Sequence, residues 1–180
     1  PTPTGPILAQ TWDIHGSAVD YVHLLRIRQR YLTHDGSKLS NEEGEIYVFT
    51  IAGCLGMTGL ANNGLGITIN NLNSTDAQVG IIWPALVRRV LACNNTQQAK
   101  ETILNAPIGS GHYYFVADPN ECCGIETSGT QKKVIHEDEN IHFHTNHCLD
   151  EELAKLNKIN PNSTTLKRFE TLTNKIPHIT

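Results

Sequence analysis

Short segments rich in β-branched and aromatic residues follow one another through the first part of the chain, with turn residues between them. In the segment 19–28, the side chains of Tyr21 and Leu25 would lie on one face of a strand, and those of Val22 and Leu24 on the other. The same composition predicts strands at residues 6–14, 19–28, 45–52 and 65–72. Turns are predicted at residues 34–37 and 62–64.

Apolar residues take helical spacing in the middle of the chain. Between residues 84 and 92 they recur with the period of a helix behind Pro84, which suits a first helical turn. A second helix that runs to about Asn105 can be capped by Asn95 or Thr96. Strands that are grouped apart from helices favour an α+β layered fold over an alternating parallel one. Further strands are predicted at residues 113–118, 123–127, 133–136 and 141–147, and helices at residues 151–157 and 164–173.

Length and composition are those of one globular domain, which we expect to span residues 1–180. Apolar residues make up 39% of the chain, charged residues make up 18%, and the net charge is −4. A negative net charge without a long basic run argues against a nucleic-acid partner, and no apolar run is long enough to cross a membrane. The five cysteines are irregularly spaced, which favours free thiols in a reducing compartment, such as the cytoplasm, over a disulfide framework.

Two short polar clusters carry the candidate chemistry, and they are informative as a pair. The first ends the segment Gly-Pro-Ile-Leu-Ala-Gln-Thr-Trp-Asp at residues 5–13, where the carboxylate of Asp13 follows Trp12. A carboxylate after a buried aromatic residue is costly unless a cation or a hydrogen-bond donor receives it. The second cluster is His-Thr-Asn-His-Cys at residues 144–148, far along the chain.

Together the two clusters resemble those of the cysteine-type N-terminal-nucleophile (Ntn) amidohydrolases, most closely the acyl-coenzyme A:6-aminopenicillanic acid acyltransferase-like branch, peptidase family C45. The resemblance extends from Gly5 to about Phe169 and implies a four-layer αββα sandwich. In that family the nucleophile is the first residue of a self-cleaved chain, and a Gln-x-Trp-Asp segment follows it. The resemblance therefore implies a cysteine upstream of Pro1 and further β-structure after Thr180. Residues 1–180 would then be an inactive fragment, cut at both ends, of an active parent.

The resemblance also implies an activity for that parent. It would hydrolyse a linear amide, or transfer its acyl group, through a thioester on the N-terminal cysteine. The substrate would be a small-molecule amide, for example of the N-acyl amino acid type. A coenzyme A thioester could serve as co-substrate, and no other cofactor is expected. The parent could form a homo-oligomer, and neither a membrane nor a nucleic acid is an expected partner.

Four residues match catalytic positions of the family. Asp13 matches the carboxylate that holds the nucleophile's amine, and Asn146 matches the amide that donates to the oxyanion. Asn71 matches a second Asn-bearing strand, although Asn70 fits when other relatives are used. Arg168 resembles the Arg of a Ser-then-Arg segment at a helix start, and its guanidinium could pair with Asp13. Turns, strand ends and solvated helix surfaces are the ordinary places for such residues, so the structural alternative stays open for each.

Substrate-binding roles are assigned to Gln10, Trp12, His112 and His147. Gln10 takes the place where the bile-salt-hydrolase branch carries an Arg, which argues against bile-salt chemistry. His112 is expected to line the pocket, and His147 to support the cluster at residues 144–148.

Two other functions remain open. On a strand, His142 and His144 would point to the same side. With His147 they could bind a metal ion in a metal-dependent hydrolase, although no carboxylate or fourth ligand follows at a recognisable spacing. A non-catalytic binding domain that keeps the fold without the nucleophile is the other alternative.

Overall fold

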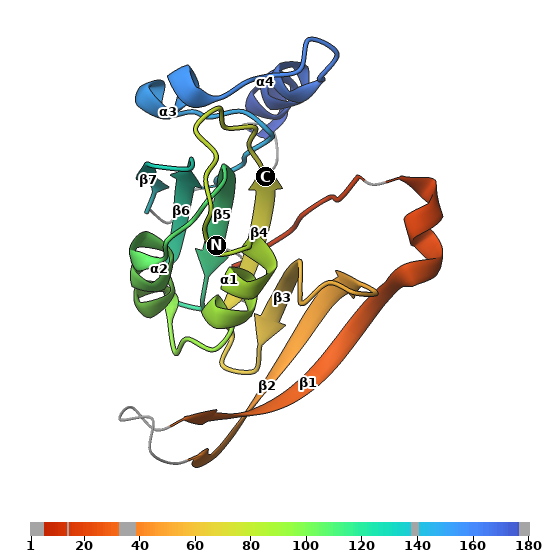
Figure 1. Cartoon of the computed structure of the whole chain (residues 1–180), viewed down its shortest axis with the longest axis vertical. Helices are drawn as coiled ribbons and strands as arrows, with labels where there is room; N and C mark the ends of the chain where they lie inside the picture. The colour runs from red at the N-terminus through yellow and green to blue at the C-terminus, as the bar shows by residue number, and fades with distance from the viewer. Residues whose placement is uncertain (1–5, 14, 33–38, 138–140, 177–180) are drawn as a thin grey trace.

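A computed structural model describes residues 6–13, 15–32, 39–137 and 141–176 of the chain. Its main element is a seven-stranded antiparallel sheet whose strands lie in chain order (Figure 1). The strands are β1 (Val22–Leu32), β2 (Leu39–Ile51), β3 (Thr58–Ala61), β4 (Gly66–Asn71), β5 (His112–Ala117), β6 (Cys122–Thr127) and β7 (Lys132–His136). The helices are the 3-10 helix η1 (Gly16–Tyr21) and the α-helices α1 (Trp83–Val90), α2 (Thr96–Asn105), α3 (Glu151–Leu156) and α4 (Thr165–Lys175).

Helices α1 and α2 pack on one face of the sheet, and the hydrophobic core lies between them and the strands (Figure 1). Every second side chain of a strand points to this face, as Val48 of β2 and Ile67 of β4 do. Leu86 and Val90 of α1 and Ile103 of α2 are buried against it because helical spacing places apolar residues on one stripe. Helices α3 and α4 follow β7 and lie at one end of the sheet (Figure 1).

Local sequence signals locate these helices well. Pro84 lies in the first turn of α1, and Asn95 caps α2 by accepting a hydrogen bond of 2.9 Å from the backbone N–H of Gln98. The turn at residues 62–64 is present, and Gly64 has the positive φ of 90° that a glycine adopts without strain. The predicted α+β class is confirmed. The described residues supply one sheet and the helices on one of its faces, which are two adjacent layers of the expected sandwich.

Two predicted strands are wrong. The described part of the segment 6–14 forms no strand, because the side chain of Gln10, rather than the backbone around it, bonds to the neighbouring β4. The segment 141–147 also forms no strand. Its side chains instead bond to β6 and α4, so the segment is held by side-chain contacts and not by a strand ladder. The expected strand 19–28 begins later, at Val22, after η1.

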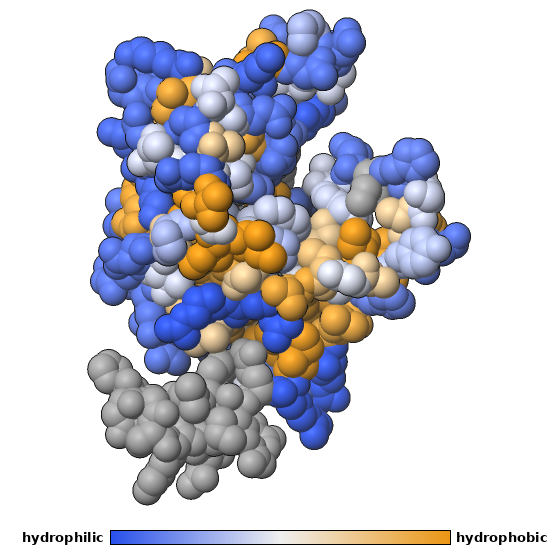
Figure 2. Space-filling model, viewed as in Figure 1, coloured by the Kyte–Doolittle hydropathy of each residue, from blue (hydrophilic) through white to orange (hydrophobic). Residues whose placement is uncertain are grey.

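The turn predicted at residues 34–37 lies outside the described residues. On the face seen in Figure 2, hydrophilic side chains dominate around α3 and α4, whereas apolar side chains gather over α1 and β1–β3. Leu24 of β1 and Leu60 of β3 are among the exposed apolar residues of that half. Within the described ranges, no helix combines the length and the apolar character that crossing a bilayer requires.

Candidate active site

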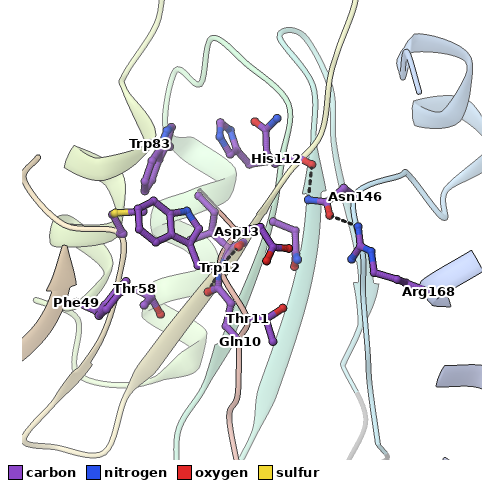
Figure 3. A pocket seen from close by; sticks show the side chains of 14 residues that line it. Gln10, Thr11, Trp12, Asp13, Phe49, Thr58, Trp83, His112, Asn146 and Arg168 are labelled. Carbon is purple, nitrogen blue, oxygen red and sulfur yellow. Dashed lines mark hydrogen bonds between the residues drawn. The ribbon is translucent and has the colours of Figure 1, made fainter. Parts of the chain in front are cut away.

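A cavity of about 320 Å³ lies where the segment 6–13 passes the end of β4 and the start of β5 (Figure 3). Its wall is built from parts of the chain that are far apart in sequence, including β2, β3, α1, the segment 141–150 and α4. The fold therefore brings both polar clusters of the sequence to one place. Seven of the predicted site residues line the cavity: Gln10, Trp12, Asp13, Asn71, His112, Asn146 and Arg168.

Gln10 fastens the first cluster to the sheet. Its Nε2 donates to the carbonyl oxygen of Ile69 at 2.6 Å, and its Oε1 accepts from the N–H of Ile69 at 3.0 Å. This pair of bonds is what a neighbouring backbone residue would offer to β4, and here a side-chain amide supplies it. Gln10 thus holds the adjoining Trp12 and Asp13 at the cavity.

Aromatic rings form one side of the cavity. Trp12 packs edge-on against Phe49, with ring centroids 5.8 Å apart. Across the cavity wall, His112 lies between Trp83 and Tyr114, with centroid distances of 5.9 and 5.8 Å. Burial lowers the pKa of His112 to about 4, because a charged imidazole would lose its hydration there. His112 is therefore neutral near pH 7 and contributes shape rather than charge.

The side-chain amide of Asn146 is held in one orientation at the cavity. Its Oδ1 accepts a hydrogen bond of 2.8 Å from Nη2 of Arg168, and its Nδ2 donates to the carbonyl oxygen of Asn71 at 3.2 Å (Figure 3). Because Arg can only donate and a carbonyl can only accept, these partners determine which end of the amide is nitrogen. The backbone N–H of Asn146 donates to Oγ1 of Thr165 at 2.7 Å.

Arg168 reaches the cavity from the first turn of α4, and its Nε donates to Oγ1 of Thr164 at 3.2 Å. The expected pairing of Arg168 with Asp13 is not found among the ion pairs of the described residues. The reason is geometric: the guanidinium is directed at the amide of Asn146. Asp13 lines the same cavity from the opposite segment, and its side chain is exposed there (Figure 3).

Asn71 contributes its backbone to the site. Its carbonyl oxygen receives the bond from Asn146, while its own Nδ2 donates to Oδ1 of Asn73 at 3.1 Å. Asn70 precedes it at the end of β4 and also lines the cavity. The structure therefore places both candidates at the site and gives Asn71 the direct contact with Asn146.

Glu126 is a residue of this region that sequence reasoning missed. Its side chain is fully buried in β6, and it accepts from Nε2 of His144 at 2.8 Å. The same carboxylate accepts from the backbone N–H groups of Leu149 at 2.5 Å and Asp150 at 3.0 Å. One buried carboxylate thus ties both ends of the segment that carries Asn146. A charged residue inside the otherwise apolar strand 123–127 was the signal that could have revealed it.

His147 does not line this cavity. It is buried behind Asn146, and its Nδ1 lies 3.1 Å from the hydroxyl oxygens of both Thr145 and Thr165. Thr165 also makes the bond to the backbone of Asn146, so the group fixes the path of the segment. The expectation that His147 supports the cluster fits this position, and its assignment to substrate binding stays a prediction.

The described residues do not provide the group of ligands that the metal-dependent hydrolase would need. No group of three or more His, Cys, Asp or Glu side chains within the described ranges is arranged to hold an ion. Both ring nitrogens of His144 are engaged, Nδ1 with the carbonyl oxygen of Thr145 at 2.6 Å and Nε2 with Glu126. His147 faces two hydroxyl groups, so the predicted trio of His142, His144 and His147 does not converge.

Solved structures that resemble this chain include a penicillin acylase. Penicillin V acylase from Agrobacterium tumefaciens superposes with a TM-score of 0.48 and 12% sequence identity. The match covers 89% of this chain and 49% of that one, so the chain spans about half the length of its neighbour. Among curated proteins, none matches the sequence.

The family assignment comes from the sequence as a whole. A family model described as acyl-coenzyme A:6-aminopenicillanic acid acyl-transferase matches residues 2–180, which is nearly the entire chain. This match includes both polar clusters and every residue that lines the cavity. It confirms the resemblance that the clusters indicated. The chain belongs to the acyl-coenzyme A:6-aminopenicillanic acid acyl-transferase family.

Proposed function

We propose that the cavity is the acyl-transfer site of an Ntn-type enzyme, which hydrolyses a small-molecule amide or transfers its acyl group through a thioester. The observation that carries the proposal is the amide of Asn146, held between Arg168 and the carbonyl oxygen of Asn71 at the cavity. Only one of the two N–H bonds of that amide is used by a partner within the described residues. The second is available to an oxyanion that develops on a substrate carbonyl.

In this proposal, three residues have different electrostatic roles: Asn146, Arg168 and Asp13. Asn146 donates to the oxyanion, and the positive charge of Arg168, 2.8 Å from Oδ1, polarises the amide and strengthens that donation. Asp13 supplies a negative charge on the opposite wall, where it can receive the ammonium form of a nucleophile's α-amine. The cavity therefore offers an oxyanion donor and an ammonium acceptor, which are the two charges that the reaction develops.

The nucleophile in this proposal is an N-terminal cysteine outside the described residues. No cysteine is among the described residues that line the cavity. Burial raises the pKa of Cys123 and of Cys148 to about 12, so these thiols stay protonated near neutral pH. A cysteine whose own α-amine takes its proton would supply the thiolate that these residues do not.

The proposed reaction has two steps. The thiolate attacks the amide carbonyl, the C–N bond breaks, and the amine leaves with the proton that the α-amine has taken from the thiol. Water or a second amine then attacks the thioester, which releases the acid or a new amide and returns the proton to the thiol. A coenzyme A thioester, as the family name suggests, would enter the same cycle as an acyl donor.

The test is to detect the thioester on protein that carries the proposed cysteine. Intact-mass analysis after brief exposure to penicillin V and to a panel of N-acyl amino acids should show one added acyl group. Hydroxylamine should remove it, and Cys→Ala at the new N-terminus should abolish it. Amide turnover without any acylated protein would overturn the mechanism. Binding of these amides with neither acylation nor turnover would instead support a non-catalytic binding domain.

A further inference from the structure

The first turn of α4 holds Asn146 at two points. Nη2 of Arg168 bonds to the side-chain Oδ1 of Asn146 at 2.8 Å, and Oγ1 of Thr165 accepts the backbone N–H of Asn146 at 2.7 Å. Thr165 and Arg168 are three residues apart, so helical geometry places both side chains on the same face of α4. One helix therefore contacts both the main chain and the side chain of the proposed oxyanion donor.

The two contacts differ in their exposure to water and substrate. Arg168 is exposed and lines the cavity, whereas Thr165 is fully buried and does not line it. In the part of the chain that the structure describes, the backbone N–H of Asn146 has no partner other than Oγ1 of Thr165. The position of this stretch of main chain therefore depends on one buried hydroxyl group, which substrate does not touch.

The proton of that hydroxyl group points away from Asn146. Oγ1 of Thr165 donates to Oγ1 of Thr145 at 2.9 Å. Thr145 in turn has two acceptors within reach, Nδ1 of His147 at 3.1 Å and the carbonyl oxygen of Thr165 at 3.2 Å. Because a backbone N–H can only donate, this order leaves a lone pair of Thr165 directed at Asn146. Hydrogen bonds that follow one another in the same direction strengthen each other in a buried site.

His147 closes the cluster from the side of α4. Its ring packs edge-on against Phe169, with ring centroids 5.2 Å apart. Burial is the main cause that lowers the pKa of His147, so the ring is neutral near pH 7. With the proton of the neutral ring on Nε2, Nδ1 accepts a hydroxyl proton and does not compete with Asn146 for the oxygen of Thr165.

We infer that Thr165 is a positioning residue for the reaction, which holds the backbone of Asn146 where the side-chain amide meets the developing oxyanion. This inference rests on the proposed function, because that function makes Asn146 the donor. Arg168 sets the direction of the amide, whereas Thr165 determines where the main chain that carries the amide lies. A catalytic group must be held within about 0.5 Å of its productive position, so loss of either contact would weaken the donor.

Thr165→Val tests the inference, because valine keeps the shape of threonine and removes the hydroxyl group. In protein that carries the proposed cysteine, kcat should fall roughly tenfold to a hundredfold, while KM should change by less than about twofold. Thr165→Ser keeps the hydroxyl group and should restore most of kcat. Thr96→Val is the matched control, since Thr96 is also buried, donates to the carbonyl oxygen of Glu121 at 3.3 Å and does not line the cavity.

A double variant separates positioning from a general loss of stability. When Asn146→Ala has already removed the donor, adding Thr165→Val should leave kcat unchanged, since Thr165 would act only through Asn146. Hydrogen exchange gives a readout on residues 1–180 without any turnover. The N–H of Asn146 should exchange at least about a hundredfold more slowly than in an unstructured peptide, and Thr165→Val, but not Thr165→Ser, should remove most of this protection.

Three results would overturn the inference and leave the thioester test untouched. They are an unchanged kcat in folded Thr165→Val, a loss of kcat that Thr165→Ser does not restore, and a loss that adds fully to that of Asn146→Ala. If Thr165→Val does not fold, exchange of the Asn146 N–H at the unstructured rate in the unmodified protein would still overturn it. Absence of the thioester from the unmodified enzyme would instead reject the proposed function, and the catalytic role of Thr165 with it.

Discussion

The guanidinium of Arg168 and the side-chain oxygen of Asn146 are 2.8 Å apart, and they join the first turn of α4 to the polar segment 144–148. This bond sets the direction of the Asn146 amide, because the oxygen must face the cation and the nitrogen must face away from it. An Asn at the end of a loop could otherwise rotate freely. The contact therefore turns an ordinary polar residue into a preoriented donor.

Asn146→Ala should lower kcat and kcat/KM together, by roughly a hundredfold or more, in protein that carries the proposed cysteine. The interaction is made chiefly in the transition state, so substrate affinity should change little. Asn174→Ala, on the exposed side of α4, is a suitable control. A normal kcat with a lowered thermal midpoint would mean that Asn146 only stabilises the fold.

Arg168→Gln should lower kcat by a smaller factor, roughly tenfold, because the amide of Asn146 remains but loses its fixed orientation and its charged partner. The double variant with Asn146→Ala should be no slower than Asn146→Ala alone, since Arg168 would act through Asn146. A double-mutant cycle measured on kcat tests this. Additive effects of the two substitutions would show that Arg168 acts independently.

Asp13→Asn should reduce turnover strongly and leave the fold intact, because it removes the negative charge that would receive the nucleophile's ammonium. The expected loss corresponds to about 2–4 kcal/mol in the activation barrier. Asp20→Asn, in the exposed helix η1, gives a matched charge change away from the cavity. Turnover close to that of the unmodified enzyme would argue against any catalytic role of Asp13.

Glu126→Gln should destabilise the protein by about 2–3 kcal/mol, since a neutral amide cannot accept from His144, Leu149 and Asp150 together and leaves a buried donor unsatisfied. Urea unfolding of residues 1–180 measures this without any assay of activity. Glu170→Gln on the exposed face of α4 is the control and should lie within about 0.5 kcal/mol. Equal stability of the two variants would contradict the anchoring role of Glu126.

His112 makes stability depend on pH. Its pKa is about 4 in the folded protein and about 6.5 in the unfolded chain. Between these values only the unfolded chain binds the proton, so the stabilisation is complete above pH 6.5 and is lost as the pH falls towards 4, by about 3 kcal/mol at most. His112→Phe should flatten this part of the curve, measured by urea unfolding at a series of pH values. An unchanged slope would show that His112 does not titrate in this window.

Local patterns in the sequence were sufficient for most regular elements. Helical spacing and Pro84 predicted α1, the side chain of Asn95 predicted the start of α2, and alternating or apolar runs predicted β4 to β7 to within one residue. These features depend on contacts between residues that are close in the chain, where capping and periodicity act directly. The polar clusters at residues 5–13 and 144–148 were also sufficient to indicate the family.

Only the tertiary structure decided how those clusters are held. Gln10 bonds to Ile69 through its side chain, and Asn146 is oriented by Arg168, although each pair is far apart in sequence. Periodicity predicted strands for both segments because it cannot distinguish a backbone that joins a ladder from one that is held by its side chains. The burial of Glu126 depends on the packing of the segment 144–150 over β6. A free carboxylate in a strand would face water, and it becomes an anchor only when three donors from that segment converge on it.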